Sequence, residues 1–279
     1  MKSIFFDSGL QHSFDENGYV IVPFLDPQQI AELDSAYHSL SGESGLNKGW
    51  HATIHSDNPE YKRKISDAIC AEFEHPAKKY VKDYKAVFAN FTVKEPNRED
   101  SQFDLHLDWS MTDETRFSSL TIWTPLIDIT DNNGYLWVLK GSHKLGFTIR
   151  GGPGLHTWSE NKSREFNPPQ FERVILKLKA GEALIYDHRL IHGSPANKSS
   201  TLRIAINYTL IPESATSLHY HFHNENEYEI FEVGPDFYLN HPIMTYPENY
   251  KSLGRFPVKG GKFLNHETFN SYCIPEVIQ

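Results

Sequence analysis

Apolar side chains recur every three or four residues in the first part of the chain, which predicts helices. Asp26-Pro27 is a typical helix start, with a capping aspartate before a proline at the first helical position. The pattern predicts a helix from Pro27 to about Leu40. A second helix or helix pair is expected from Pro59 to about Tyr84, and Pro76 could break it. The apolar positions of the first helix are Ile30, Leu33, Tyr37 and Leu40.

From Ala86 onward the pattern changes to short segments typical of strands, separated by turns. Residues 17–23 predict an earlier turn and short strand, and residues 42–58 are polar and predict a loop. Residues 145–170 hold several glycines and prolines and predict a long excursion that covers a site. Helices followed by many short strands predict an antiparallel β-sandwich or jelly roll with helices outside. The expected strands are 87–93, 102–108, 118–127, 135–139, 173–178, 183–187 and 202–211.

No repeat and no low-complexity linker divides the sequence. We therefore expect a single domain over residues 1–279. It would comprise a helical part at about 1–85, a jelly-roll core at about 86–211 and a C-terminal extension at 212–279.

Composition narrows the possible partners. The net charge of −9 makes nucleic acid an improbable ligand, and no apolar run approaches the length of a membrane-spanning helix. The two cysteines form no disulfide framework, which favours a reducing, cytoplasmic location. Fifteen histidines raise the expectation of a metal site slightly. These features favour a small-molecule substrate, with no nucleic acid and no membrane as partner.

The first candidate site lies in residues 103–108, which alternate strictly between apolar and polar. In a strand, Asp104, His106 and Asp108 share one face, and Phe103, Leu105 and Leu107 share the other. An imidazole and a carboxylate on one face can bind the same metal ion. Taken alone, this short pattern is more often a solvent-facing polar stripe.

The second candidate site lies in the strand at residues 202–211. Arg203, Ala205, Asn207 and Thr209 share one of its faces. A guanidinium beside small and polar neighbours suits a pocket for a small dianion, because it can form two parallel bonds to a carboxylate. A typical strand arginine instead pairs with a surface acid.

Taken together, these segments resemble the phytanoyl-CoA dioxygenase family of Fe(II)- and 2-oxoglutarate-dependent oxygenases. The resemblance covers roughly residues 14–40 and 86–211. It implies a mainly β fold, the double-stranded β-helix (a cupin-like jelly roll), with flanking N-terminal α-helices. Its motifs are 17–23, His106-Leu107-Asp108, Asn132-Asn133-Gly134, residues 138–144, residues 190–194, and Arg203 eleven residues after His192.

By this resemblance, His106, Asp108 and His192 are the iron ligands. Two histidines and one carboxylate leave positions on the metal for 2-oxoglutarate and O₂. The resemblance also implies that Arg203 holds the distal carboxylate of 2-oxoglutarate, with Ser194 as a hydroxyl donor and Trp123 lining the cosubstrate site. For Trp123, an ordinary place in the core is about equally expected.

Other histidines compete for these roles. His188 lies four residues before His192 and is a rival ligand. We prefer His192 because it directly precedes Gly193-Ser194 and because its spacing to Arg203 fits the family. His143 is expected to be structural. His219, His221 and His223 alternate along one strand, and their role stays open.

The leading hypothesis is therefore a 2-oxoglutarate-dependent dioxygenase that hydroxylates an unactivated C–H bond of a small metabolite, releasing succinate and CO₂. Asp108 favours hydroxylation, because halogenating relatives have a small residue there. The alternatives are a cupin-like metal-dependent isomerase and a non-catalytic jelly-roll binding protein. No basic cluster suits a CoA phosphate, so a polar amino acid, a peptide or a natural-product intermediate is the expected substrate. Residues expected to shape its pocket are Tyr220, Phe222, Tyr228, Phe231 and Phe237.

Overall fold

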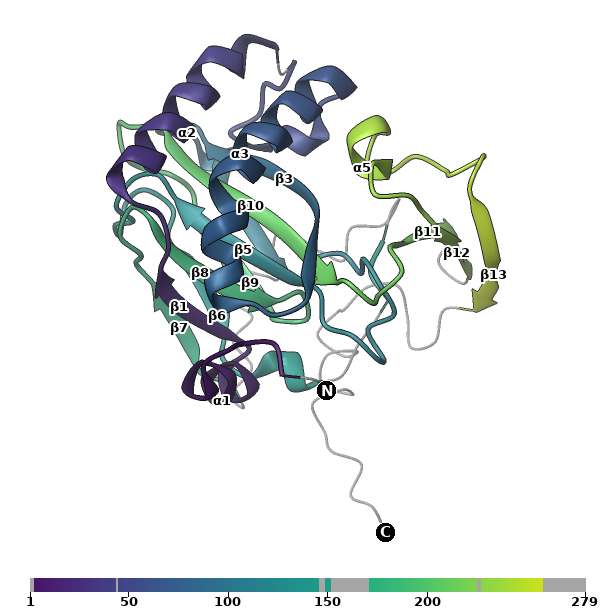
Figure 1. Ribbon diagram of the computed structural model, residues 1–279. Helices are drawn as coiled ribbons and strands as arrows, with labels where there is room; N and C mark the ends of the chain where they lie inside the picture. Colours follow the sequence, from purple (N-terminus) through teal and green to yellow (C-terminus); the bar gives the residue numbers. More distant parts are fainter. Residues whose placement is uncertain (1–2, 44, 146–148, 152–170, 225–226, 258–279) are drawn as a thin grey trace.

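Antiparallel strands dominate the fold in the computed structural model of the protein (Figure 1). The structure describes residues 3–43, 45–145, 149–151, 171–224 and 227–257. The strands are β1 (Tyr19–Pro23), β2 (Trp50–Ala52), β3 (Tyr84–Lys94), β4 (Phe103–His106), β5 (Leu120–Pro125), β6 (Leu136–Leu139), β7 (Arg173–Leu176), β8 (Glu182–Asp187), β9 (His192–Ser194), β10 (Arg203–Pro212), β11 (Leu218–Asn224), β12 (Glu227–Glu232) and β13 (Lys251–Pro257).

Two of the sheets pack together to form the jelly roll. The first has the strand order β1-β8-β5-β10-β3-β2, and the second has the order β4-β9-β6-β7. A buried cluster joins them, with Trp123 and Leu184 from the larger sheet and Val138 and Leu176 from the smaller. The fold is a double-stranded β-helix, as the sequence predicts.

Helices cover the outer face of the larger sheet, where α2 and α3 lie across β3 and β10 (Figure 1). Aromatic contacts fix this layer: Tyr37 packs on Phe91 with ring centroids 5.3 Å apart, and Phe73 packs on Tyr208 at 5.5 Å. The opposite face of the sheet is therefore left for the pocket described below. The helices are α1 (Ser8–Asn17), α2 (Pro27–Leu40), α3 (Pro59–Tyr80) and α5 (Phe237–Asn240), with 3₁₀ turns η1 (Ser41–Glu43), η2 (Thr53–His55), η3 (Glu99–Ser101) and η4 (Ser142–Leu145).

Helix α2 begins and ends as expected, but α3 does not break at Pro76. Asp26 and Gln29 cap α2 reciprocally, each side chain accepting from the other's backbone N–H. In α3, Pro76 removes the N–H that would bond the carbonyl of Glu72. The Gln29 side chain donates to that carbonyl instead, at 3.1 Å, so the helix continues with the group satisfied.

The N-terminal part contributes more than helices. Strand β1 pairs with β8 at one edge of the larger sheet, and β2 pairs with β3 at the other. Helix α1 was not expected, and Gly18 ends it in the left-handed conformation with φ of 84°. The expectation of a plain loop at residues 42–58 was wrong, because this stretch contains β2 and η2.

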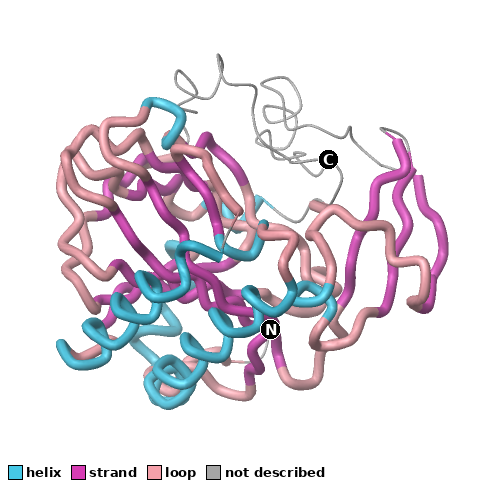
Figure 2. The backbone as a smooth tube through the Cα atoms, turned by 90° about the horizontal axis from the view of Figure 1, so that it is seen from above, coloured by secondary structure: helices cyan, strands magenta, loops and turns pink. Residues whose placement is uncertain are grey.

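The C-terminal part forms a third sheet, β11-β12-β13, which projects to one side of the jelly roll (Figure 2). Most of the excursion expected at residues 145–170, and the chain beyond residue 257, lie outside the described residues. No helix among the described ranges is both long and apolar enough to cross a membrane.

Candidate metal centre and adjoining pocket

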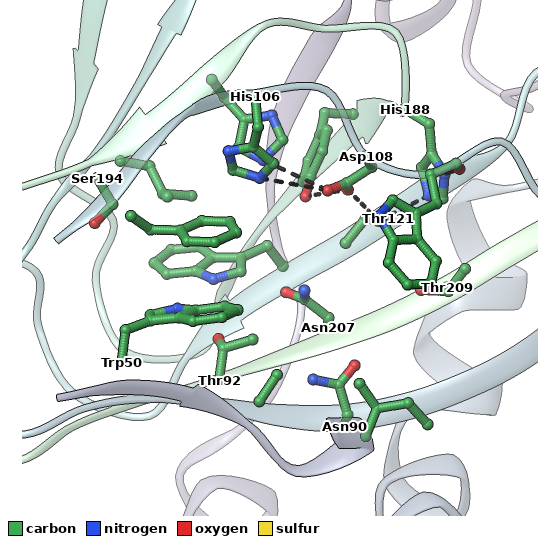
Figure 3. Close-up of a pocket in the computed structure, with 18 of the residues that line it drawn as sticks. Trp50, Asn90, Thr92, His106, Asp108, Thr121, His188, Ser194, Asn207 and Thr209 are labelled. Carbon is green, nitrogen blue, oxygen red and sulfur yellow. Dashed lines mark hydrogen bonds and ion pairs between the residues drawn. The ribbon is translucent and has the colours of Figure 1, made fainter. Parts of the chain in front are cut away.

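Three predicted ligands come together at the end of a pocket (Figure 3). One ligand atom each of His106, Asp108 and His192 lies within 4.8 Å of the other two. Asp108 Oδ1 is 3.6 Å from His106 Nε2 and 3.7 Å from His192 Nε2. Such a group of two imidazoles and one carboxylate can hold a transition-metal ion on one side and leave its other side open.

The pairing of two short strands brings the histidines together. His106 at the end of β4 is the register partner of His192 at the start of β9, and their rings lie 4.1 Å apart. Asp108 follows just after β4, where its backbone N–H donates to the carbonyl of His188. The carboxylate is therefore positioned by a loop rather than by the continuous strand that the alternation predicts.

The predicted apolar face of β4 was wrong for Phe103. The register shifts between Phe103 and His106. Phe103 consequently lies on the pocket side with its ring 4.1 Å from that of His106, while Leu105 and Leu107 point into a separate core cluster. A bulge of this kind changes the face on which a residue lies.

Hydrogen bonds prepare both imidazoles for a metal. Nδ1–H of His106 donates to the carbonyl of Asp104 at 2.8 Å, and Nδ1–H of His192 donates to that of Leu190 at 2.9 Å. Each Nε2 therefore presents its lone pair toward Asp108. Burial, followed by the nearby His106, lowers the pKa of His192 to about 4 and keeps it neutral at pH 7.

The second oxygen of Asp108 is held by the larger sheet. Tyr186 donates its hydroxyl hydrogen to Oδ2 at 2.7 Å, and Thr121 Oγ1 lies 3.1 Å from the same atom. Burial raises the pKa of Asp108, but a hydrogen bond from His106 and the charge that the nearby histidines carry when protonated outweigh it and hold the pKa well below its ordinary value. The carboxylate is thus charged, with Oδ1 directed to the histidines.

His188 and His143 lie outside this group of three. Both ring nitrogens of His188 have partners, the Trp109 carbonyl at 2.8 Å and Thr121 Oγ1 at 2.9 Å. His143 lies against α1, with its Nε2 3.2 Å from the Asp15 carbonyl. The geometry therefore favours His192 over His188 and a structural place for His143.

Two buried basic residues lie side by side further along the pocket. Arg203 on β10 is the register partner of Lys94 on β3, and both side chains line the pocket. Arg203 is 2% exposed, and its Nε and Nη1 have no hydrogen-bond partner. Burial lowers its pKa to about 9, which still leaves it charged at pH 7. An unpaired buried guanidinium is costly, so these residues suit an anionic ligand.

Lys94 was not singled out from the sequence. It is 0% exposed and its Nζ donates to the carbonyls of Ser194 and Pro195 at 3.1 and 2.6 Å. Burial, and then the nearby Arg203, lower its pKa well below the usual range. The sequence does contain a pattern that could have identified Lys94, because Asn90, Thr92 and Lys94 alternate with apolar residues along β3.

Trp123 and Ser194 also line the pocket. The Arg203 guanidinium lies over the Trp123 ring at 5.7 Å from its centroid. The Ser194 hydroxyl donates to the Gly134 carbonyl at 3.1 Å, so a bond to a ligand would replace this one. The structure brings all six predicted site residues to one pocket.

Much of the remaining lining was not predicted from the sequence, and other residues were expected there. Trp50 lies in the stretch predicted to be a loop, yet it lines the pocket. The expected tail aromatics do not appear among the described lining residues: Tyr220, Phe222, Tyr228, Phe231 and Phe237 all lie elsewhere. His219, His221 and His223 lie on β11 and form no metal-binding group within the described part of the chain.

Comparison with known sequences agrees with the motifs. Residues 14–205 match the sequence model of the phytanoyl-CoA dioxygenase (PhyH) family. A phytanoyl-CoA dioxygenase domain-containing protein 1 homolog of Dictyostelium discoideum is 29% identical over 181 residues, which cover 60% of this chain and 59% of that protein. The ectoine dioxygenase of Sphingopyxis alaskensis is 25% identical over 215 residues, covering 66% and 69%.

Solved structures share the fold. EctD from S. alaskensis, determined with 2-oxoglutarate and 5-hydroxyectoine, has a TM-score of 0.55 at 19% identity, covering 76% of this chain and 78% of that one. The epimerase SnoN, in complex with Fe³⁺, α-ketoglutarate and nogalamycin RO, has a TM-score of 0.54 at 21% identity, covering 75% and 84%. At these identities the likeness shows a common architecture.

Proposed function

The chain belongs to the phytanoyl-CoA dioxygenase family, and from this premise we propose that it is an Fe(II)- and 2-oxoglutarate-dependent dioxygenase. In the proposed reaction, one oxygen atom of O₂ enters a C–H bond of a small metabolite and the other enters succinate, with release of CO₂. One observation carries the proposal: a buried arginine without an acidic hydrogen-bond partner shares a pocket with a group of three metal-binding side chains.

His106, Asp108 and His192 would hold the iron. When bound, Fe(II) supplies the activation of O₂ that drives oxidative decarboxylation of the cosubstrate. The chain contributes the fixed ligand geometry: the backbone carbonyls behind both histidines and the Tyr186 hydroxyl behind Asp108 restrict rotation of the three side chains.

Arg203 would bind the distal carboxylate of 2-oxoglutarate through its free Nε and Nη1, against the face of Trp123. Lys94 lies beside it with its Nζ on the carbonyls of Ser194 and Pro195, and Ser194 lies two residues after His192 on β9. A metal-dependent isomerase or a simple binding protein would need this second, cationic end only for an anionic ligand of its own, whereas a 2-oxoglutarate-dependent enzyme needs it in every case. The arrangement therefore favours the dioxygenase over both alternatives.

Succinate formation tests this proposal. The protein with Fe(II), 2-oxoglutarate and O₂ should form succinate slowly without substrate, and faster with a substrate. Asp108→Ala should form none while keeping its fold. A folded Asp108→Ala protein with parent-level succinate formation would contradict the proposal.

Hydroxylation is the finer part of the proposal. SnoN is an epimerase and SnoK, a further structural neighbour, is a carbocyclase, so the shared architecture accompanies other reactions in those proteins. Mass spectrometry of the product formed under ¹⁸O₂ distinguishes them. Hydroxylation predicts one labelled oxygen in the product, whereas an epimerisation or ring closure leaves the product unlabelled.

A further inference from the structure

The pocket floor changes character along two paired strands. β3 and β10 each direct alternate side chains into the pocket, and their register sets these in rows. Lys94 and Arg203 form the first row, Asn90 and Asn207 the third. Phe88 and Thr209 form the fourth, next to an apolar cluster. Arg203 thus makes the first row cationic, and the third row, two rows away, carries the neutral amides Asn90 and Asn207, both labelled in Figure 3.

A continuous aromatic wall runs along the pocket from its first row, where Trp50 on β2 is the register partner of Lys94, and Trp50 also packs against the apolar cluster beside the fourth row. Trp50 stacks on Phe103 with ring centroids 4.0 Å apart and planes 12° apart, and Phe103 in turn contacts the ring of His106. The run of rings therefore leads from a metal ligand outward to Trp50. Such a wall favours a flat or apolar molecule lying close to the metal.

The amide region offers an unused hydrogen-bond acceptor. The Oδ1 atom of Asn207 is buried and has no partner among the described residues. Its neighbour Asn90 uses Nδ2 to donate to the Phe91 carbonyl at 3.1 Å, which fixes that side chain. In Figure 3 Asn207 rises from the sheet between Trp50 and Asp108. A ligand N–H or O–H would satisfy this acceptor.

Besides histidines, the charged side chains in the described lining are Lys94 and Arg203 in the first row and Asp108 in the metal-binding group, and none lies in the third or fourth row. The other residues beside the fourth row and Trp50 are Ile54, Trp109, Met111, Ile243 and His55. A charged substrate group placed here would lose water without gaining a counter-ion.

We propose that Trp50 and Asn207 select the substrate, and that it is an uncharged molecule with a planar or apolar body and an N–H or O–H group that donates to Asn207. This inference rests on the proposed function, because it assigns the other end of the pocket to 2-oxoglutarate. It narrows the expectation from sequence by disfavouring a free amino acid.

Matched probes test this assignment by equilibrium binding. Calorimetry would compare indole-3-acetamide, indole-3-acetate and tryptamine, with corresponding naphthalene compounds, on enzyme loaded with Fe(II) and 2-oxoglutarate without O₂. The amides should bind at least about tenfold more tightly than the acids or amines. Equal or tighter binding of a charged member, or no binding of any probe at millimolar concentration, would overturn the proposal.

Substitutions of Asn207 and Trp50 test whether the amide probes bind at these two residues. Asn207→Leu should weaken amide binding about tenfold and leave 2-oxoglutarate affinity unchanged, with Asn207→Ala as a smaller replacement should the leucine impair folding. Asn240→Leu, on the exposed end of α5, is the matched control and should change neither. Trp50→Ala should weaken every planar probe, and Trp50→Phe should restore most of the affinity.

Binding of 2-oxoglutarate to the same preparations distinguishes failure of the proposed function from failure of the substrate assignment alone. If the metal-loaded protein does not bind 2-oxoglutarate, the proposed function fails. If it binds 2-oxoglutarate but Asn207→Leu keeps parent affinity for the amides, the substrate assignment alone fails.

Discussion

Two arginines are buried to a similar degree but differ in their hydrogen-bond partners. Arg150 is 0% exposed and Arg203 is 2% exposed. Nη1 and Nη2 of Arg150 each donate to a carboxylate oxygen of Glu114 at 2.6 Å, and its Nε donates to the Asp108 carbonyl at 2.6 Å. Arg203 has no partner for Nε and Nη1, and its register partner is a second basic residue, Lys94.

The difference separates a structural charge from a binding charge. Glu114 is itself buried, so the Arg150 pair is a closed unit that fixes the loop carrying Asp108. At Arg203 the fold retains an uncompensated cation, which is tolerable when a ligand completes it. Burial alone would not distinguish the two arginines, whereas their hydrogen-bond partners do.

Loss of a metal ligand should have the largest effect, because Asp108, His106 and His192 act as one set. His192→Ala should abolish Fe(II) binding, measured by equilibrium titration. His188→Ala is the control from the same loop and should weaken binding modestly at most, since its ring nitrogens bond Trp109 and Thr121. The reverse result would move the ligand assignment to His188.

Breaking the paired arginine should damage stability. Glu114→Ala leaves Arg150 buried without its partner and should lower the free energy of unfolding by about 3–5 kcal/mol. Arg203→Met, which removes an uncompensated cation, should not destabilise the ligand-free protein. Urea denaturation of both variants measures the contrast. Equal losses of stability would remove the distinction between the two arginines.

Removing the unpaired arginine should instead damage cosubstrate binding. Arg203→Ala loses two charge-assisted bonds of about 1.5–3 kcal/mol each, part of which water replaces. The KM for 2-oxoglutarate should rise by about one to three orders of magnitude. Arg203→Lys should recover only part, because an ammonium lacks the planar fork. Succinate formation during a 2-oxoglutarate titration measures this, and an unchanged KM would exclude Arg203 as the clamp.

A buried histidine should have a smaller effect on stability than a buried arginine, because a histidine can lose its proton and become neutral. His219 packs against Phe237, its Nε2 has no partner, and burial, then His221, lower its pKa to about 3. Below its ordinary pKa of about 6.5, the unfolded chain binds a proton that the folded chain refuses. The free energy of unfolding should therefore decrease as the pH is lowered from about 6.5 to about 3.

His219→Phe should reduce the slope of unfolding free energy against pH in that window relative to the parent. The pKa of His192 is also lowered, so the difference between the two proteins isolates His219. An identical slope would show that the buried imidazole of His219 does not disfavour protonation.

Local patterns predicted the parts of the site that local structure controls. The alternation around Arg203 placed Arg203, Asn207 and Thr209 on one face, and all three line the pocket. The His106-Leu107-Asp108 motif identified two members of the metal-binding group, although Asp108 lies beyond the strand.

Features set by distant partners could not be predicted in this way. Phe103 changed sides because β4 shifts register against β9, about ninety residues later in the chain. Trp50 reaches the pocket because a three-residue strand pairs with β3, and three residues give no periodicity to recognise. The pairing of Arg203 with Lys94 likewise depends on strand register rather than on sequence spacing.

The central claim is that the three metal ligands and the unpaired cationic end hold Fe(II) and 2-oxoglutarate together in one pocket. Anaerobic absorption spectroscopy tests it most directly. The protein should give a weak visible charge-transfer band only when both Fe(II) and 2-oxoglutarate are present, and Arg203→Ala should require much more 2-oxoglutarate to reach it. If the protein binds Fe(II) but no band forms at saturating 2-oxoglutarate, the account is contradicted.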